Sequence, residues 1–167
     1  MGTERRTVDL SDYPDLVVIM LGMQPHGLRG LRTLRGLRTE IARSVRDRPD
    51  GLLHHDTLTV STWPVHKLLR QYWRDLDSLE RWTRSMPHSA WWRRFIRDSG
   101  GTSFYHEVYA RGGGMEGAFI NMTGPVGMMN FAPVVSAHGA MFGFRGRLGR
   151  PEGQPPLVTE TELQATR

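Results

Sequence analysis

The chain has 167 residues, enough for one domain with its own apolar core. It contains no cysteine, which excludes thiolate catalysis, thiolate-ligated haem, iron–sulfur clusters and cysteine zinc sites, and leaves histidine as the main candidate metal ligand. The formal net charge of +5 comes mostly from arginines at helical spacing, which predicts a solvated helix face and no specific nucleic-acid site.

Composition divides the chain into three parts. Residues 1–13 are expected to form a flexible N-terminal arm, residues 14–148 a single α+β domain, and residues 149–167 a disordered tail. The N-terminus is polar and the longest apolar run, residues 16–23, is too short to cross a bilayer. We therefore expect a cytoplasmic protein that does not bind membranes.

The first half of the domain has the pattern of a strand, a helix and a strand pair. Residues 16–23 are apolar and rich in β-branched side chains, which predicts a central strand. Residues 31–46 have the periodicity of an amphipathic helix. Residues 52–62 and 65–75 predict two antiparallel strands. The adjacent His54–His55 pair would face opposite sides of its strand and is interpreted as structural.

A helical region with an aromatic face follows. It is expected to begin near Asp77, which has capping-box spacing to Glu80, and to be interrupted by Pro87. Beyond this proline, one histidine and three aromatic residues recur at i, i+3, i+4 and i+7: His88, Trp91, Trp92 and Phe95. This spacing predicts an apolar helix face that carries a histidine in its first turn.

The next stretch, residues 102–122, predicts a hairpin around the turn at Gly112–Gly114. Alternation places His106 on the more apolar face of the first strand. An unpaired polar group buried there would cost about 1–3 kcal/mol, so His106 needs a metal or a hydrogen-bond partner. A backbone carbonyl or Glu116 of the second strand would serve as that partner.

After the hairpin the chain is rich in Gly, Met and Phe, which favours a loop over a hydrophobic site. The predicted order of elements is that of a ferredoxin-like β-α-β-β-α-β sandwich with one extra strand. The open sheet face of this fold is usually covered by a second copy. We therefore expect a homodimer, arranged as a dimeric α/β barrel.

Several collinear motifs resemble known families. The chain is similar, from about residue 16 to 135, to a small family of bacterial monooxygenase-like dimeric α/β-barrel proteins. It also resembles the C-terminal half of the haem-dependent aldoxime dehydratases. The shared motifs are Leu79-Glu80-Arg81-Trp82, His88, His106-Glu107-Val108, and Glu116 with Asn121.

The resemblance implies a haem b site. In the dehydratases, a helix histidine is the axial iron ligand and the histidine of the strand motif helps to protonate the leaving hydroxyl. Transferred to this chain, these roles fall to His88 and His106, with Glu116 and Asn121 as further catalytic candidates. The slot for haem would be lined by aromatic and methionine side chains, namely Trp91, Trp92, Phe95, Phe104, Met122 and Met128.

The chain also departs from the dehydratases. They enter the helix with His-Pro-x-His where this chain has Met86-Pro87-His88, they are about twice as long, and their distal arginine and serine have no counterpart in this sequence. From the residues alone, the favoured interpretation is that His88 is an ordinary first-turn helix residue and His106 a core histidine bonded to a backbone carbonyl or Glu116.

Three hypotheses follow. The first is a haem-dependent lyase or oxidoreductase acting on a small nitrogen–oxygen or aromatic substrate. The second is a cofactor-independent monooxygenase for an electron-rich aromatic compound, with His106 and Asn121 in its pocket. The third is a non-catalytic module that binds a hydrophobic ligand. No P-loop, nucleophile elbow, zincin helix or dinucleotide fingerprint occurs in the sequence.

Overall fold

The computed structural model describes residues 8–125, 129, 131, 133–149 and 155–164. Five antiparallel strands form one sheet in the order β2-β3-β1-β4-β5. The strands are β1 (Val17–Pro25), β2 (Leu52–Thr62), β3 (Val65–Trp73), β4 (Thr102–Ala110) and β5 (Met115–Ile120). The helices are α1 (Gly27–Arg46), α2 (Leu76–Arg84), α3 (His88–Arg97), η2 (Gly139–Met141), α4 (Phe144–Arg147) and α5 (Glu160–Gln164).

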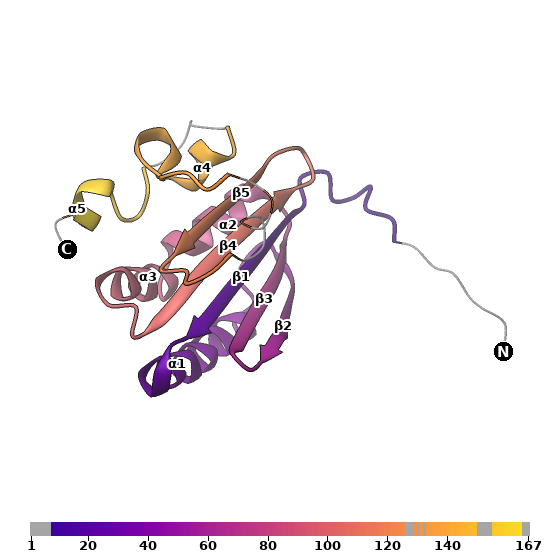
Figure 1. The fold of residues 1–167 in the computed structure, drawn as a ribbon. Helices are drawn as coiled ribbons and strands as arrows, with labels where there is room; N and C mark the ends of the chain where they lie inside the picture. Colours follow the sequence, from indigo (N-terminus) through magenta and orange to yellow (C-terminus); the bar gives the residue numbers. More distant parts are fainter. Residues whose placement is uncertain (1–7, 126–128, 130, 132, 150–154, 165–167) are drawn as a thin grey trace, which may run out of the picture.

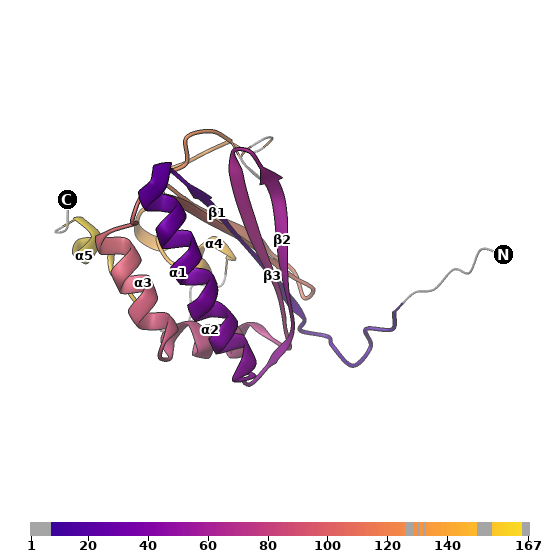
Figure 2. The same ribbon diagram turned by 90° about the horizontal axis from the view of Figure 1, so that it is seen from below.

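The predicted α+β class and the ferredoxin-like order of elements are confirmed. The apolar run near the N-terminus is β1, which lies at the centre of the sheet between β3 and β4. The extra strand is β5, which forms one edge. The helices α1, α2 and α3 lie on the same side of the sheet (Figures 1 and 2). The site predicted on the apolar side of β4 therefore lies between the sheet and the helices.

Two helix starts differ from the predictions. Helix α1 begins at Gly27, four residues before the predicted start, because His26 is extended and its imidazole Nε2 lies 2.6 Å from the Ser103 hydroxyl. Helix α2 is capped by Asp75 and not by Asp77. The Asp75 carboxylate accepts a hydrogen bond from the Ser78 backbone N–H at 2.6 Å, which satisfies a free donor of the first turn.

The alternation of strand residues determines which side chains face the helices. Strand register aligns Val17 with Trp73, Ile19 with Val108, and Leu21 with His106. The buried members of this face form the main core with residues of α2 and of the C-terminal region: Val17, Ile19, Trp73, Leu76, Leu79, Val108 and Leu148. His106 thus faces the helices beside this core, as its strand alternation predicted.

Residues 133–148, here called the cover segment, pack over the helix side of the sheet near β5. Leu148 at its end is buried in the core, and Phe144 packs against that core. Gly146 approaches the Ala140 carbonyl so closely that an added Cβ would lie 1.7 Å from its oxygen. A glycine is needed there for the segment to fold back on itself. The segment covers a hydrophobic site as predicted, but it is not a plain loop, because it contains the short helices η2 and α4.

The terminal regions are described in part. Residues 8–13 are exposed, and the Arg111 guanidinium bonds the carbonyls of Leu10 and Tyr13. Residues 155–164 include helix α5, within the part predicted as a tail. The domain boundaries remain predictions. Among the described residues, no helix is long and apolar enough to span a bilayer.

Candidate functional site

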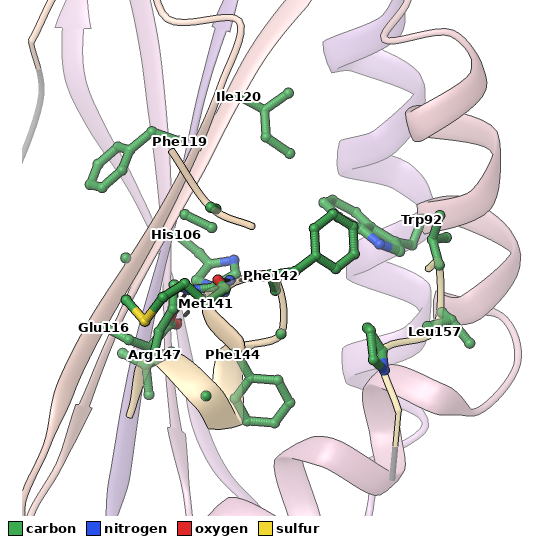
Figure 3. A pocket seen from close by; sticks show the side chains of 18 of the residues that line it. Trp92, His106, Glu116, Phe119, Ile120, Met141, Phe142, Phe144, Arg147 and Leu157 are labelled. Carbon is green, nitrogen blue, oxygen red and sulfur yellow. Dashed lines mark hydrogen bonds and ion pairs between the residues drawn. The ribbon is translucent and has the colours of Figure 1, made fainter. Parts of the chain in front are cut away.

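A large cavity lies between the helix side of β4 and β5, the helices α2 and α3, and the cover segment. Its volume is about 1650 Å³, above the roughly 300–1,000 Å³ typical of ligand pockets. Figure 3 shows Trp92 on the helix side of this cavity, with His106 and Glu116 on the sheet side. His88 and His106 both line it. The two histidines therefore face one cavity, which a haem site between them would require.

The sequence places His88 at the first position of α3, directly after the corner with α2. Its ring Nδ1 lies 2.8 Å from the Thr83 backbone carbonyl, which can only accept a hydrogen bond. Nδ1 therefore carries the proton and Nε2 has the lone pair. The centroid of the Trp82 ring lies 4.5 Å from that of the His88 ring, so Trp82 packs against the imidazole. These contacts orient a neutral imidazole like those of metal-ligating histidines.

Burial lowers the pKa of His88 below its ordinary value of 6.5, and the nearby charge of His106 lowers it further, against an opposing effect of the Thr83 carbonyl. A lowered pKa keeps the imidazole unprotonated at neutral pH. A metal ligand must be in this form, because the lone pair of a protonated ring is occupied.

His106 is held by a buried carboxylate. Its Nε2 lies 2.7 Å from Glu116 Oε1, and the side chains of His106 and Glu116 are 18% and 0% exposed. The other carboxylate oxygen, Oε2, accepts a bond of 2.6 Å from Arg147 Nε. Because Nε2 is engaged by Glu116, Nδ1 is the ring nitrogen of His106 that remains for other contacts. Figure 3 shows the three side chains converging.

Two opposing effects act on the pKa of Glu116. Burial raises the pKa, since an ionised carboxylate loses its water. The positive charges and hydrogen bonds of His106 and Arg147 outweigh this effect and hold the pKa below its ordinary value of 4.5. Glu116 is therefore ionised at neutral pH and lies at ion-pair distance from His106.

The predicted slot residues divide into three groups. Trp92, Phe95 and Phe104 line the cavity and contact one another, with ring centroids 5.6–5.8 Å apart. Trp91 and Met122 do not line it, although the Trp91 ring lies 6.2 Å from that of His88. Met128 lies outside the described residues.

Asn121 lies at the edge of the cavity, away from the other catalytic candidates. It follows the end of β5, is exposed, and has a φ of 56°. Its backbone carbonyl accepts a hydrogen bond from the Ser103 hydroxyl. The structure therefore brings His106 and Glu116 into direct contact and places Asn121 at the rim.

The sequence did not reveal three parts of the site. Trp82 was part of a recognised motif, but its packing on His88 depends on the angle between α2 and α3. Thr83 contributes its backbone carbonyl, which no pattern of side chains in the sequence indicates. Arg147 reaches the site from a glycine-rich segment without periodicity, 31 positions away from Glu116.

The residues present fit a haem group. A haem iron requires one axial imidazole and an apolar slot, and the cavity offers a neutral His88 with an unengaged Nε2 beside the aromatic cluster Trp92, Phe95 and Phe104. Arg97 also lines the cavity and is a candidate to face the propionates, whereas Arg84 and Arg145 line it but are paired with Glu80. In the described part of the chain, no group of three His, Asp or Glu residues is placed to hold a bare metal ion.

Fold and cavity together define a ferredoxin-like α+β protein with a large aromatic-lined cavity between sheet and helices. The chain belongs to the Monooxygenase af470-like family, whose model matches residues 16–128. This assignment confirms the resemblance inferred from the sequence motifs.

Aliphatic aldoxime dehydratases are also similar in sequence. Those of Rhodococcus globerulus and Rhodococcus erythropolis are each 38% identical to the chain, over 79 and 66 residues. The matches cover 46% and 38% of this chain but only 22% and 19% of the dehydratases. The matched part thus spans about a fifth of the length of these relatives.

Solved structures of an aldoxime dehydratase and of an oxygenase are also similar to the chain. A crystal structure of an aldoxime dehydratase in complex with butyraldoxime is 31% identical, with a TM-score of 0.47 over 60% of this chain and 28% of that one. A cofactor-independent oxygenase from Streptomyces nogalater is 17% identical, with a TM-score of 0.43 over 57% and 91%.

Proposed function

We propose that the protein is a haem b-binding enzyme that dehydrates a small compound containing a nitrogen–oxygen bond, such as an aldoxime. The observation that carries the proposal is the placement of His88 and His106 on one cavity, with His88 fixed as a neutral ligand by the Thr83 carbonyl. The 38% identity to aliphatic aldoxime dehydratases supports the choice of chemistry.

In this proposal, His88 holds the iron through Nε2, and the aromatic cluster of α3 and β4 packs against the porphyrin. When bound, the haem supplies an iron that binds the substrate nitrogen. The apolar walls exclude water from the reacting bond. Arg97, at the C-terminal end of α3, is assigned to the propionates.

His106 is assigned the proton transfers. Dehydration of an aldoxime delivers one proton to the leaving hydroxyl and removes one from the adjacent carbon, so that water and a nitrile form. In the proposal, His106 donates the first proton from Nδ1 and then accepts the second at the same atom. Glu116 binds Nε2–H throughout and stabilises the ring while it carries two protons.

The first test is an absorption spectrum of protein expressed with haem supply. We expect a Soret band in the wild type, its loss in His88→Ala, and its retention in His54→Ala, because His54 is exposed on β2. A wild-type protein that takes up no haemin would contradict the proposal, as would a His88→Ala variant with an unchanged spectrum.

The second test addresses the acid–base role of His106. We expect His106→Ala to bind haem as the wild type does and to lower kcat for aldoxime dehydration by about 10²–10⁴-fold, the usual contribution of general acid–base catalysis. Turnover of butyraldoxime is measured by nitrile formation. An unchanged kcat would exclude His106 as the proton donor.

Family membership favours a second candidate, a cofactor-independent monooxygenase. In this function the His106–Glu116 pair would act as a base that removes a phenolic proton from an aromatic substrate, which then reacts with oxygen. Haem-free protein would consume oxygen with a phenol and lose this activity in His106→Ala. If neither reaction occurs and apolar ligands still bind, the cavity belongs to a binding module.

A further inference from the structure

Arg147 connects the site to the cover segment. Besides its bond to Glu116, it donates from Nη1 to the carbonyls of Met141, at 3.0 Å, and Phe142, at 2.7 Å. Its side chain is only 11% exposed. A single guanidinium therefore holds both a buried carboxylate and the backbone that lies over the cavity. Figure 3 shows Met141 and Phe142 beside the His106–Glu116 pair.

The same segment has a second anchor that does not touch this pair. Arg145 binds Glu80 Oε2 through Nε at 2.6 Å and Asp77 Oδ1 through Nη2 at 2.5 Å, and both carboxylates belong to α2. Because Arg145 and Arg147 are two positions apart in α4, they reach opposite walls of the cavity. One anchor involves the candidate acid–base group and the other does not.

The contacts of Glu116 explain why Arg147 matters to His106. A fully buried carboxylate with one partner would have an unsatisfied oxygen, at a cost of several kcal/mol per ion in an apolar interior. Arg147 satisfies Oε2, so that the carboxylate stays ionised with Oε1 at 2.7 Å from Nε2 of His106. Without it, the carboxylate would take up a proton or turn away from the imidazole.

We infer that Arg147 is a positioning residue that fixes the orientation and tautomer of His106 through Glu116 and ties the cover segment to that pair. The inference rests on the proposed function only for the catalytic use of His106. The arrangement itself exists without haem or substrate. It makes the cover segment part of the acid–base site, so that a closed cavity and a correctly oriented His106 occur together.

The test measures the imidazole ¹⁵N shifts of His106 in haem-free protein at about pH 8, where an ordinary histidine is neutral. Its signals are assigned by their loss in His106→Gln. We expect the wild-type shifts to report a proton on Nε2, the ring nitrogen that lies 2.7 Å from Glu116 Oε1. Arg147→Met should lose this pattern, and the amides of residues 139–148 should exchange about tenfold faster or more, because bonds to a charged group are lost.

Two variants separate the effect of Arg147 on His106 from its attachment of the cover segment. Arg147→Lys keeps a cation for Glu116 but not the paired bonds to Met141 and Phe142, so the ¹⁵N pattern should persist while amide exchange accelerates. Arg145→Met removes the anchor to α2 and should accelerate exchange without changing His106. If Arg147→Met fails to fold, the comparison of Arg147→Lys with Arg145→Met decides the matter.

Either of two results would overturn the inference. The first is an unchanged His106 pattern in folded Arg147→Met. The second is an equal loss of the pattern in Arg145→Met and Arg147→Lys, which would show that any loosening of the segment disturbs His106. Both measurements use protein without cofactor, so failure of the haem proposal leaves them interpretable.

Discussion

The Glu116 side chain has no exposed surface, and both of its carboxylate oxygens are in ion pairs, one with His106 and one with Arg147. Its sequence neighbours give little indication of this role, since a glutamate in an edge strand is usually solvated. Its environment is created by a histidine ten positions earlier and an arginine that arrives from the cover segment. The pairing of His106 with Glu116 was predicted as one alternative to a cofactor role. The structure shows the pairing and also places His106 on the cavity wall.

The stability that the ionised Glu116 contributes depends on pH. The folded pKa of Glu116 lies below 4.5, so between the two values the unfolded state binds more protons and the unfolding free energy decreases as pH falls. This contribution is complete above about pH 4.5 and is lost as pH falls through the folded pKa. Glu116→Gln should therefore destabilise the protein by about 3–5 kcal/mol at neutral pH and by less in acid.

Urea unfolding of the wild type and Glu116→Gln across this range provides the measurement. The quantity of interest is the difference between the two unfolding free energies at each pH. Protonation of His88 is common to both proteins and cancels in the difference. A difference that stays constant down to the lowest pH at which both proteins fold would show that Glu116 is not held ionised by its partners.

At the scale of elements, helix α1 offers two glycines in contrasting settings. At Gly30 an added Cβ would lie 2.2 Å from the Gly101 carbonyl oxygen and 2.9 Å from Pro25 Cα, both of the backbone. Nothing lies within 4 Å of a Cβ at Gly36. Gly30 therefore allows α1 to approach the start of β4, and Gly36 is an exposed helical position with no such constraint.

We predict opposite effects for the two alanine variants. Gly30→Ala should destabilise the protein by about 1–3 kcal/mol, because backbone atoms must move. Gly36→Ala should stabilise it by up to about 1 kcal/mol through helix propensity. Thermal unfolding followed by circular dichroism measures both. Equal shifts of Tm in the same direction would mean that the approach of α1 to the β4 loop is not tight.

Sequence periodicity predicted the elements better than the site. The alternation in β4 correctly placed His106, and the i, i+3, i+4, i+7 pattern of α3 placed Trp92 and Phe95 on the cavity but was wrong for Trp91. These patterns are local consequences of helix and strand geometry. Arg147 and Thr83 were missed because their contributions depend on a long-range contact and on a backbone carbonyl. The contrast between Trp91 and Trp92 likewise depends on how α3 is rotated in the fold.

At the scale of the molecule, the sheet face opposite α1, α2 and α3 has no helix against it in the described part of the chain. Its side chains include a buried network in which Tyr105 stacks on Phe119 at 5.8 Å and its hydroxyl lies 3.1 Å from His66 Nε2. The central strand β1 presents Met20 there, between Arg70 and Glu107 in the register. This mixed apolar and polar surface suits a second copy of the sheet.

We therefore expect a homodimer through this face, as predicted from the order of elements. Light scattering coupled to size-exclusion chromatography should give twice the chain mass for the wild type. Met20→Lys should give the monomer mass, because it places a charge at the centre of the face without entering the cavity. Arg43→Glu on the exposed side of α1 is the control. A monomeric wild type would refute the expectation.

The hydrogen bond that His88 donates to the Thr83 carbonyl affects how far the sequences of this family can diverge. Because the acceptor is a main-chain oxygen, any residue at position 83 that keeps the corner between α2 and α3 supplies it equally well. The orientation of His88 therefore depends on the backbone path at this corner and not on the side chain at position 83. A distant relative can therefore differ at the other positions around this corner and, as long as it keeps a histidine at the start of α3, present the same lone pair to the cavity.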